Sequence, residues 1–243
     1  MSKGAEVAKE IWKLLELEPR IDLARHPLSI DVTTDGEVAL KGEVENISEK
    51  KLIINKARSV FGVKEISDQI FVRLDEMVED GAVAEYLTEK LSDEPLLKNC
   101  SLTLGLNGQF RIVRKSLYRI QGNILFSVSD GVISLDRFVN NFIQKQIAGV
   151  LAWWTPGTRH VRNLLNVVPP EVNYSDDQLS DTVRMVLEKN PLLTLREFQV
   201  LSQNGAITLS GSVHTEAQKL LAENDAWYVE GVNMVKNHLS IQE

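Results

Sequence analysis

Residue types that could carry catalytic chemistry are few in this sequence, and they do not form groups. Two of the four histidines share the C-terminal region but have no evident third metal ligand; the four are His26, His160, His214 and His238. Ser48 and Lys51 have S-x-x-K spacing without the companion motifs of the enzymes that use it. The sequence holds no HExxH, no phosphate-binding G-x-x-x-x-G-K-[ST] and no G-x-S-x-G. It therefore predicts a protein without enzymatic activity, metal site or cofactor.

The single cysteine, Cys100, excludes an intrachain disulfide framework. No activating group is evident beside it, so we expect an inert buried thiol. The chain has 243 residues, of which 43% are hydrophobic and 25% are charged, as is usual for one large or two to three small globular domains. The net charge of −7 argues against a generic nucleic-acid binder.

The charge is distributed unevenly. Residues 109–162 hold eight Lys or Arg and only two acids, Asp130 and Asp136, whereas the rest of the chain is acidic. Such a basic segment is either a solvated face that contacts acidic neighbours within the molecule, or a site for anionic headgroups, phosphates or an acidic protein. The candidate site residues are Arg111, Arg114, Lys115, Arg119, Arg159 and Arg162.

Two adjacent tryptophans, Trp153 and Trp154, end a predicted helix in the same segment. Trp154 shares a helix face with Ile147 and Leu151, which favours a core position. Trp153 points about 100° away. Either both rings pack against the sheet or a neighbouring module, or Trp153 is an exposed aromatic anchor for a membrane or partner surface.

A ten-residue phrase occurs three times, as DGEVALKGEV at 35–44, DGVISLDRFV at 130–139 and NGAITLSGSV at 204–213. Seven positions agree in one register without a gap: a turn glycine, apolar residues at +2, +4 and +8, a glycine at +26, and apolar residues at +30 and +34. The turn glycines are Gly36, Gly131 and Gly205, and the later glycines are Gly62, Gly157 and Gly231. Three internal copies predict a modular protein.

Each copy predicts the same order of elements. Asp-Gly or Asn-Gly between alternating apolar residues indicates a hairpin turn. A helix follows, at 48–61 in copy one, and the glycine at +26 suits its C-terminal end. Another helix precedes each hairpin, at roughly 4–17, 81–93 and 176–189. The fold class is therefore α+β, with three tandem αββαβ modules of a small three-stranded sheet and two helices each.

The middle copy is longer than the others. Its turn glycine lies 95 residues after the first and 74 before the third, so about 21 residues are inserted, at about 99–123. Within them, SLTLGLNGQFRIV has its own Asn-Gly turn and predicts an extra β-hairpin. The expected domains are 1–75, 78–169 and 173–243, and their short linkers favour contact between modules.

The repeated phrase, followed by a helix and LAWWTPGTRHVRNLLNV, resembles the BON domain. The residues that carry the resemblance include Gly36, Leu40, Gly42 and Gly62 in copy one; Gly131, Leu135, Trp154, Gly157, Val161 and Asn163 in copy two; and Gly205, Leu209, Gly211, Gly231, Val235 and Asn237 in copy three. Copy two has Arg137 where the family often has glycine, and copy one has Arg58 and Ser59 in place of the aromatic pair.

The resemblance implies a non-enzymatic module of bacterial envelope, osmotic-stress and secretion-associated proteins, which binds phospholipid membranes or other proteins. The main hypothesis is binding of anionic phospholipid through the basic middle module. The alternative is a protein–protein scaffold or stress-response adaptor, and a third reading is a small-ion or metabolite site between modules.

The insertion is the expected functional element because copies one and three lack it. On a regular strand, Arg111, Val113 and Lys115 face one way, while Ile112 and Arg114 face the other. The N-terminal segment has no apolar run typical of a signal peptide, and no stretch approaches the roughly 18 apolar residues of a membrane span. The chain as written is therefore expected to be cytoplasmic, and periplasmic only if a signal peptide has been removed.

Overall fold

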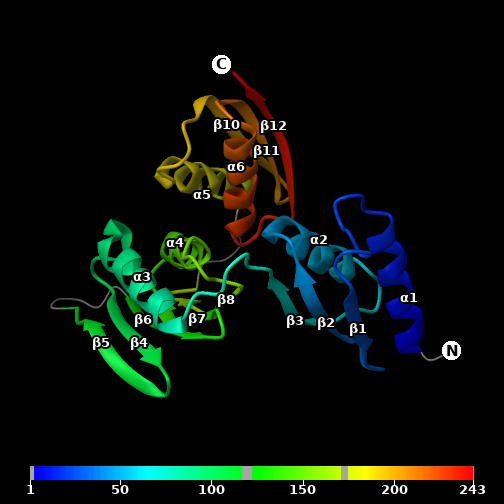
Figure 1. Cartoon of the computed structure of the whole chain (residues 1–243), viewed down its shortest axis with the longest axis horizontal. Coiled ribbons are helices and arrows are strands. Elements are labelled where there is room, and N and C mark those ends of the chain that lie inside the picture. Colours follow the sequence, from blue (N-terminus) through cyan, green and yellow to red (C-terminus); the bar gives the residue numbers. More distant parts are fainter. Residues whose placement is uncertain (1–2, 117–121, 171–174, 243) are drawn as a thin grey trace. The chain divides into compact units, whose positions relative to one another are not determined.

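The computed structural model describes residues 3–116, 122–170 and 175–242, apart from the side chain of Arg196. The chain divides into two compact units, Met1–Arg73 and Leu74–Glu243. The first unit holds one αββαβ body, which we call the first body. The second unit holds two, which we call the middle and third bodies (Figure 1).

The first body has the predicted order of elements. It consists of α1 (Lys3–Glu16), β1 (Leu28–Val32), β2 (Glu37–Val44), α2 (Ile47–Arg58) and β3 (Glu65–Val72). β2 lies at the centre of the sheet, antiparallel to β1 and parallel to β3. Both helices cover one face of the sheet (Figure 1). Ile11, Leu40 and Ile53 are buried in the resulting core.

The third body repeats this arrangement at the C-terminus. It consists of α5 (Asp176–Lys189), β10 (Arg196–Gln203), β11 (Ala206–Val213), α6 (Glu216–Tyr228) and β12 (Met234–Ile241). Its strand order is β10-β11-β12, with β11 antiparallel to β10 and parallel to β12. Ser175 caps α5 through a capping box with Gln178, at the spacing that favours one.

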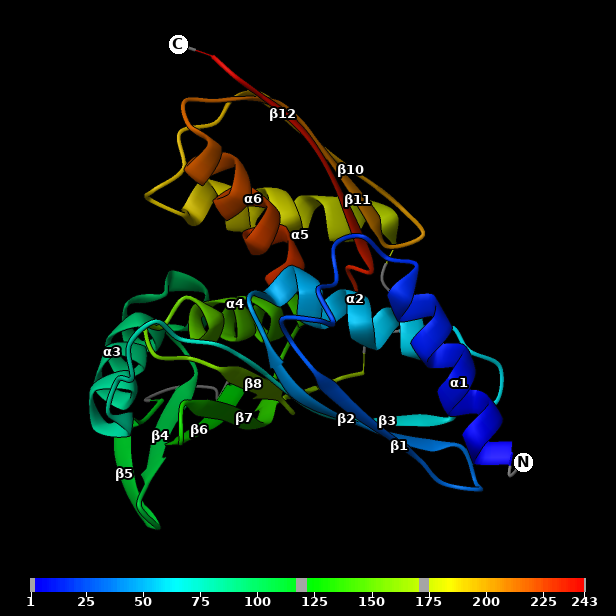
Figure 2. The ribbon, with the colours of Figure 1, turned by 45° about the vertical axis from the view of Figure 1, so that its right-hand side comes forward.

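The middle body contains the same elements and the predicted extra hairpin. They are α3 (Asp80–Asp93), β6 (Gly122–Ser129), β7 (Val132–Val139), α4 (Phe142–Trp153) and the return strand, which is split into β8 (His160–Asn163) and β9 (Asn166–Val167). After α3 and the short 3₁₀ helix η1 (Pro95–Leu97) come β4 (Ser101–Leu106) and β5 (Gln109–Arg114). The sheet has the order β5-β4-β6-β7-β8, with β9 also paired to β7. The hairpin therefore widens the sheet at one edge, where Figure 2 shows it extending beyond the rest of the body.

The repeated glycines are explained by one close approach. In the middle and third bodies, a Cβ atom on Gly131 or Gly205 would lie 2.8 Å from the carbonyl oxygen of Gly157 or Gly231. All four residues have positive φ, between 71° and 98°. The hairpin turn thus touches the end of the second helix, and the turn glycine has no room for a side chain. Gly36 and Gly62 make the same approach in the first body.

Each second helix also begins with the same pair of side-chain bonds. The capping oxygens of Asn46, Asn141 and Thr215 accept from the amides of Glu49, Gln144 and Gln218. Those Glu and Gln side chains accept in return from the amides of Glu45, Asn140 and His214. The arrangement is like a capping box, except that the residue before the cap is the donor.

A polar residue at one position ties each return strand to the second helix. Its side-chain oxygen accepts from the amide two residues later, in the pairs Asp68–Ile70, Asn163–Leu165 and Asn237–Leu239. The amides of Asn163 and Asn237 also donate to the carbonyls of Lys145 and Lys219, at 3.0 and 2.8 Å. Asp68 has no N–H to donate, and the ammonium of Lys50 bonds to its carboxylate at 2.8 Å instead.

Candidate functional site

The hairpin arginines Arg111 and Arg114 lie on the side of the sheet that the helices cover. A β-bulge lets Ile112 and Val113 together oppose Thr103, so that Arg111 lies opposite Leu104 and Arg114 opposite Leu102. Leu102 and Leu104 belong to the buried core under α3 and α4. The expected alternation of the basic residues between two faces is therefore wrong, because the bulge brings Arg111 and Arg114 onto the same face.

Arg114 fastens the hairpin to the rest of the middle body. Its guanidinium donates to the carbonyls of Ser92, Leu97 and Cys100, at 2.9, 2.5 and 3.0 Å. The guanidinium is thus occupied within the protein and is not presented to a ligand. Burial raises the pKa of the Cys100 thiol to about 11, as expected for an inert cysteine.

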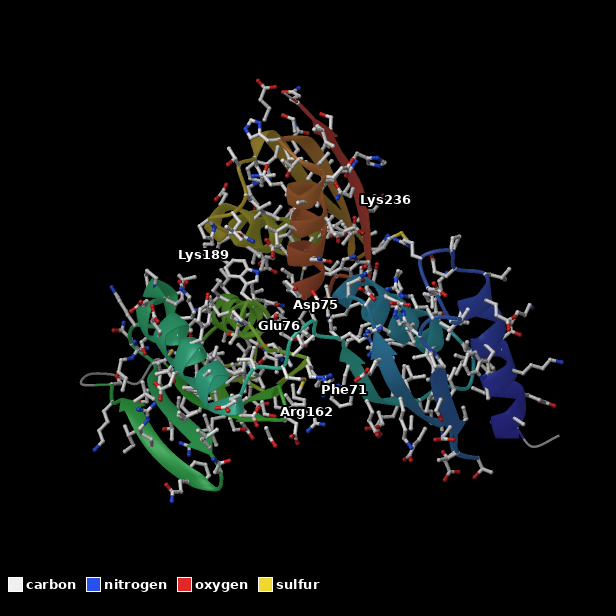
Figure 3. The ribbon with its side chains drawn as sticks, in the orientation of Figure 1. Phe71, Asp75, Glu76, Arg162, Lys189 and Lys236 are labelled. Atoms are coloured by element: carbon white, nitrogen blue, oxygen red, sulfur yellow. The ribbon has the colours of Figure 1, made fainter. Side chains whose placement is uncertain are left out.

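The other predicted cations are spread over the body. Arg111 is exposed and pairs with Glu85 of α3 at 2.7 Å. Lys115 is exposed just after β5. Arg159 is half-buried beside the β6–β7 turn, where its amide donates to Gly131. Arg162 is exposed on β8 (Figure 3). Arg119 lies outside the described residues. Among the described residues, the structure does not bring these cations together as one patch.

The face of the middle sheet opposite α3 and α4, which we call the open face, is a more coherent surface. Two rows of paired residues cross it: Phe110, Gly105, Ser127, Ser134 and Arg162 in the first, and Ile112, Thr103, Leu125 and Asp136 in the second. A third row contains Ser101, Asn123, Phe138 and Asn166. The three rows combine apolar, hydroxyl, amide and charged groups.

The apolar part of the open face lies at its free edge. Phe110 and Ile112 are 71% and 58% exposed on β5. The ring of Phe110 lies over Gly105, where a Cβ would be only 3.2 Å from it. These two side chains point out of the hairpin that the other bodies lack. The basic residues of the insertion are visible in the sequence, but the exposure of Phe110 and Ile112 depends on the register of the hairpin.

The tryptophan pair lies where the middle and third bodies meet. Trp153 stacks on Tyr228 of α6, with ring centroids 5.5 Å apart. The indole N–H of Trp154 donates to Asp225 of α6 at 2.7 Å. Trp153 therefore packs against a neighbouring body, which was one of the two expectations for it. The predicted contact between modules is confirmed for these two bodies.

Asp225 is a buried ionisable group of this junction. Asn190 donates to its second oxygen at 2.6 Å, so both oxygens accept a hydrogen bond. Burial nevertheless raises the pKa of Asp225 to about 6, despite the opposing effect of these two bonds. Gln146 of α4 adds two bonds to the backbone of Glu230, and Lys189 pairs with Glu94 at 3.1 Å. Figure 3 shows Lys189 at this junction.

A cleft of about 560 Å³ opens beside the junction. Its walls include Tyr86, Lys90, Asp93, Trp153, Leu192 and Tyr228. The ammonium of Lys90 lies 5.1 Å from the centroid of the Tyr86 ring. Because the lining carries cations and acids on mixed apolar walls, it selects no charge class of ligand.

The described residues contain no group of three or more His, Cys, Asp or Glu residues placed to hold a metal ion. Among the helices of 3–116, 122–170 and 175–242, none combines the length and the apolar character that crossing a membrane requires.

Solved structures give weak likenesses. Two are of CdsD, a structural protein of the Type III secretion system of Chlamydia trachomatis, and one of these is its C-terminal domain. Both are 15% identical and cover 98% of this chain, and the matches span 98% and 92% of the CdsD chains. Their TM-scores of 0.25 are too low to support an argument. No curated protein matches the chain.

One protein family matches two segments of the chain. Residues 4–73 and 175–243, more than half of the chain, match the family described as BON domain. These segments are the first and third bodies, and the match does not extend to the middle body. The chain belongs to the BON-domain family.

Proposed function

We propose that this chain is a non-enzymatic binding protein that attaches to anionic phospholipid surfaces through the open face of its middle body. The observation that carries the proposal is the exposure of Phe110 and Ile112 side by side on the added hairpin. Phospholipid binding is also the activity implied by membership of the BON family. The face thus offers apolar side chains that can enter a lipid interface.

Two exposed cations lie on the same body. Lys115 directly follows β5, and Arg162 lies on β8 at the far end of the row that begins at Phe110. Burial of a large apolar side chain contributes about 1.5 to 3 kcal/mol, scaled here by the partial exposure of Phe110 and Ile112. Each cation near an anionic membrane adds about 1 kcal/mol. Contributions of this size support weak, reversible and salt-sensitive attachment.

We also propose that the middle body is a third BON domain, although the family match omits it. Its strand order, its turn–helix glycine contact and its two side-chain bond patterns coincide with those of the outer bodies. The hairpin separates α3 from β6, and Arg137 replaces a glycine. Both differences interrupt the sequence pattern while leaving the αββαβ core in place.

A protein scaffold is the second candidate function. β5 forms the edge of the middle sheet and pairs only with β4 among the described strands. An edge strand can accept an extended segment of a partner by strand addition. Such a partner would contact the same Phe110 and Ile112 side chains.

Co-sedimentation with vesicles tests the lipid proposal. The double variant F110S/I112S should lose binding to phosphatidylcholine vesicles that contain phosphatidylglycerol, with an unchanged thermal unfolding midpoint. The matched control is L201S, which removes a 63% exposed leucine from β10 of the third body and should bind like the wild type. Wild-type protein that stays in the supernatant at low salt would favour the scaffold instead.

A further inference from the structure

Arg137 has a backbone conformation that is unusual for its residue type. Its φ is +82°, in the left-handed region that non-glycine side chains rarely occupy. The corresponding residues of the first and third bodies are Gly42 and Gly211, with φ of +149° and +129°. A glycine would therefore suit this position better, and the middle body carries an arginine instead.

The conformation disturbs the sheet locally. In the outer bodies the central strand pairs with its return strand over eight consecutive residues. In the middle body the return strand breaks between β8 and β9, opposite Asp136 and Arg137. The interruption of regular pairing thus coincides with the position of Arg137. Outliers of this kind gather at functional sites, and they justify a hypothesis of function.

The conformation places the guanidinium on the open face. Arg137 pairs with Ile124, whose side chain is in the core. Its guanidinium nevertheless donates to the side-chain oxygen of Asn123, at 3.2 Å, and Asn123 belongs to the open face. The amide of Arg137 donates to the carboxylate of Asp136 at 2.5 Å, which supports the turned backbone. The side chain of Arg137 remains exposed.

We propose that Arg137 is the residue that recognises the phosphate of an anionic phospholipid headgroup. The inference rests on the proposed attachment of the open face to lipid. A guanidinium binds phosphate oxygens through paired N–H donors. Because the oxygen of Asn123 accepts from Arg137, the amide N–H groups of Asn123 remain as further donors to the same phosphate. In this arrangement Phe110 and Ile112 enter the apolar layer of the membrane, and Arg137 binds the headgroup phosphate at the membrane surface.

The charges around Arg137 fit this role. The carboxylate of the adjacent residue, Asp136, is engaged by the backbone amide of Arg137. Lys115 and Arg162 add positive charge at other points of the middle body. A purely structural role fits less well, because among the residues described the guanidinium bonds only to Asn123, on the surface.

The variant R137G separates function from structure. It restores the residue of the outer bodies, so the thermal unfolding midpoint should stay the same or rise. Its affinity for vesicles of phosphatidylcholine with phosphatidylglycerol should fall about fivefold, the effect expected for one lost cation. Its weak affinity for pure phosphatidylcholine vesicles should not change. The control R184S removes an arginine of the third body whose side chain is 43% exposed, and it should leave both affinities unchanged.

The outcomes distinguish this inference from the proposed function. If F110S/I112S loses vesicle binding while R137G retains the full preference for phosphatidylglycerol, the face binds lipid and the assignment of Arg137 is wrong. If the wild type binds neither kind of vesicle, both proposals fail. A titration with inorganic phosphate, followed by the NMR signal of the Asn123 side chain, gives a third arm. Saturation by free phosphate without vesicle binding would overturn the lipid assignment.

Discussion

The middle and third bodies share one hydrogen-bonded frame and differ on the face that their helices leave open. In the third body this face carries Leu201 among polar residues such as Gln199 and Lys236. In the middle body the hairpin adds Phe110 and Ile112, and Arg137 takes the place of a glycine. The features that both bodies share form the fold, and the features specific to the middle body gather on one surface.

The first body differs from the other two in the residue types of its shared hydrogen-bond positions inside the fold, where it has acids in place of amides. Where the other bodies have Gln144 and Gln218, it has Glu49, which also accepts from the amide of Asp22 and lies 3.2 Å from His26. Where they have asparagine, it has Asp68, which binds Lys50. Each acid therefore comes with a new donor. What the fold requires at these positions is a satisfied hydrogen bond, and not one residue type.

The largest expected effect comes from the turn glycines. Gly205 and Gly108 have the same φ of +76°, but only Gly205 has atoms of other residues close to a Cβ position, whereas Gly108 has none within 4 Å. We expect G205A to lower the free energy of unfolding by about 3 kcal/mol and G108A, at the hairpin tip, by about 1 kcal/mol. Urea denaturation measures both. Equal losses would show that the turn–helix contact is unimportant.

Much of this frame follows from sequence. Gly-containing turns, helix caps such as Ser175 and the added hairpin follow from local rules of backbone and capping chemistry. The bulge that brings Arg111 and Arg114 onto one face depends on pairing between β4 and β5 and has no sequence signal. The stacking of Trp153 on Tyr228 depends on how two bodies pack. The left-handed backbone of Arg137 has one signal in the sequence, which is that an arginine stands where the other two copies have glycine.

A smaller effect is expected from exchanging the acid and amide of the helix starts. The two carboxylate oxygens of Glu49 accept from the backbone amides of Asp22 and Glu45. In E49Q one of these oxygens becomes an NH₂ group, which then faces a backbone N–H that needs an acceptor. In Q144E, a carboxylate oxygen replaces the N–H that donates to the carbonyl of Leu96. Each exchange should cost about 2 kcal/mol in thermal or urea unfolding.

The exposed change E16Q in α1 is the control for these exchanges and should be nearly neutral. A neutral E49Q would mean that the acid of the first body is interchangeable with the amide of the others. The comparison between the bodies would then concern only chance differences.

The junction between the middle and third bodies should respond to pH by a still smaller amount. Burial raises the pKa of Asp225 from 3.8 to about 6, so the native state binds this proton more tightly than the unfolded state does. The contribution of Asp225 to stability therefore increases as the pH falls from about 7 to about 5, by about 1 kcal/mol.

Urea unfolding of the wild type and of D225N, each near neutral pH and near pH 5, isolates this contribution. D225N loses a hydrogen bond at every pH but should lack the gain on acidification. The interpretation of the junction is wrong if the two proteins change in parallel, because other carboxylates would then account for the whole pH dependence.

The most direct test of the central claim locates the lipid contact on the molecule. An environment-sensitive dye is attached to F110C or to L201C in the otherwise unchanged chain; Cys100 is fully buried and does not compete for the label. Vesicles containing phosphatidylglycerol should shift the emission of the dye at position 110 to shorter wavelength and leave the dye at position 201 unchanged. An equal shift at both positions, or a shift at position 201 alone, would contradict the assignment of lipid binding to the open face of the middle body.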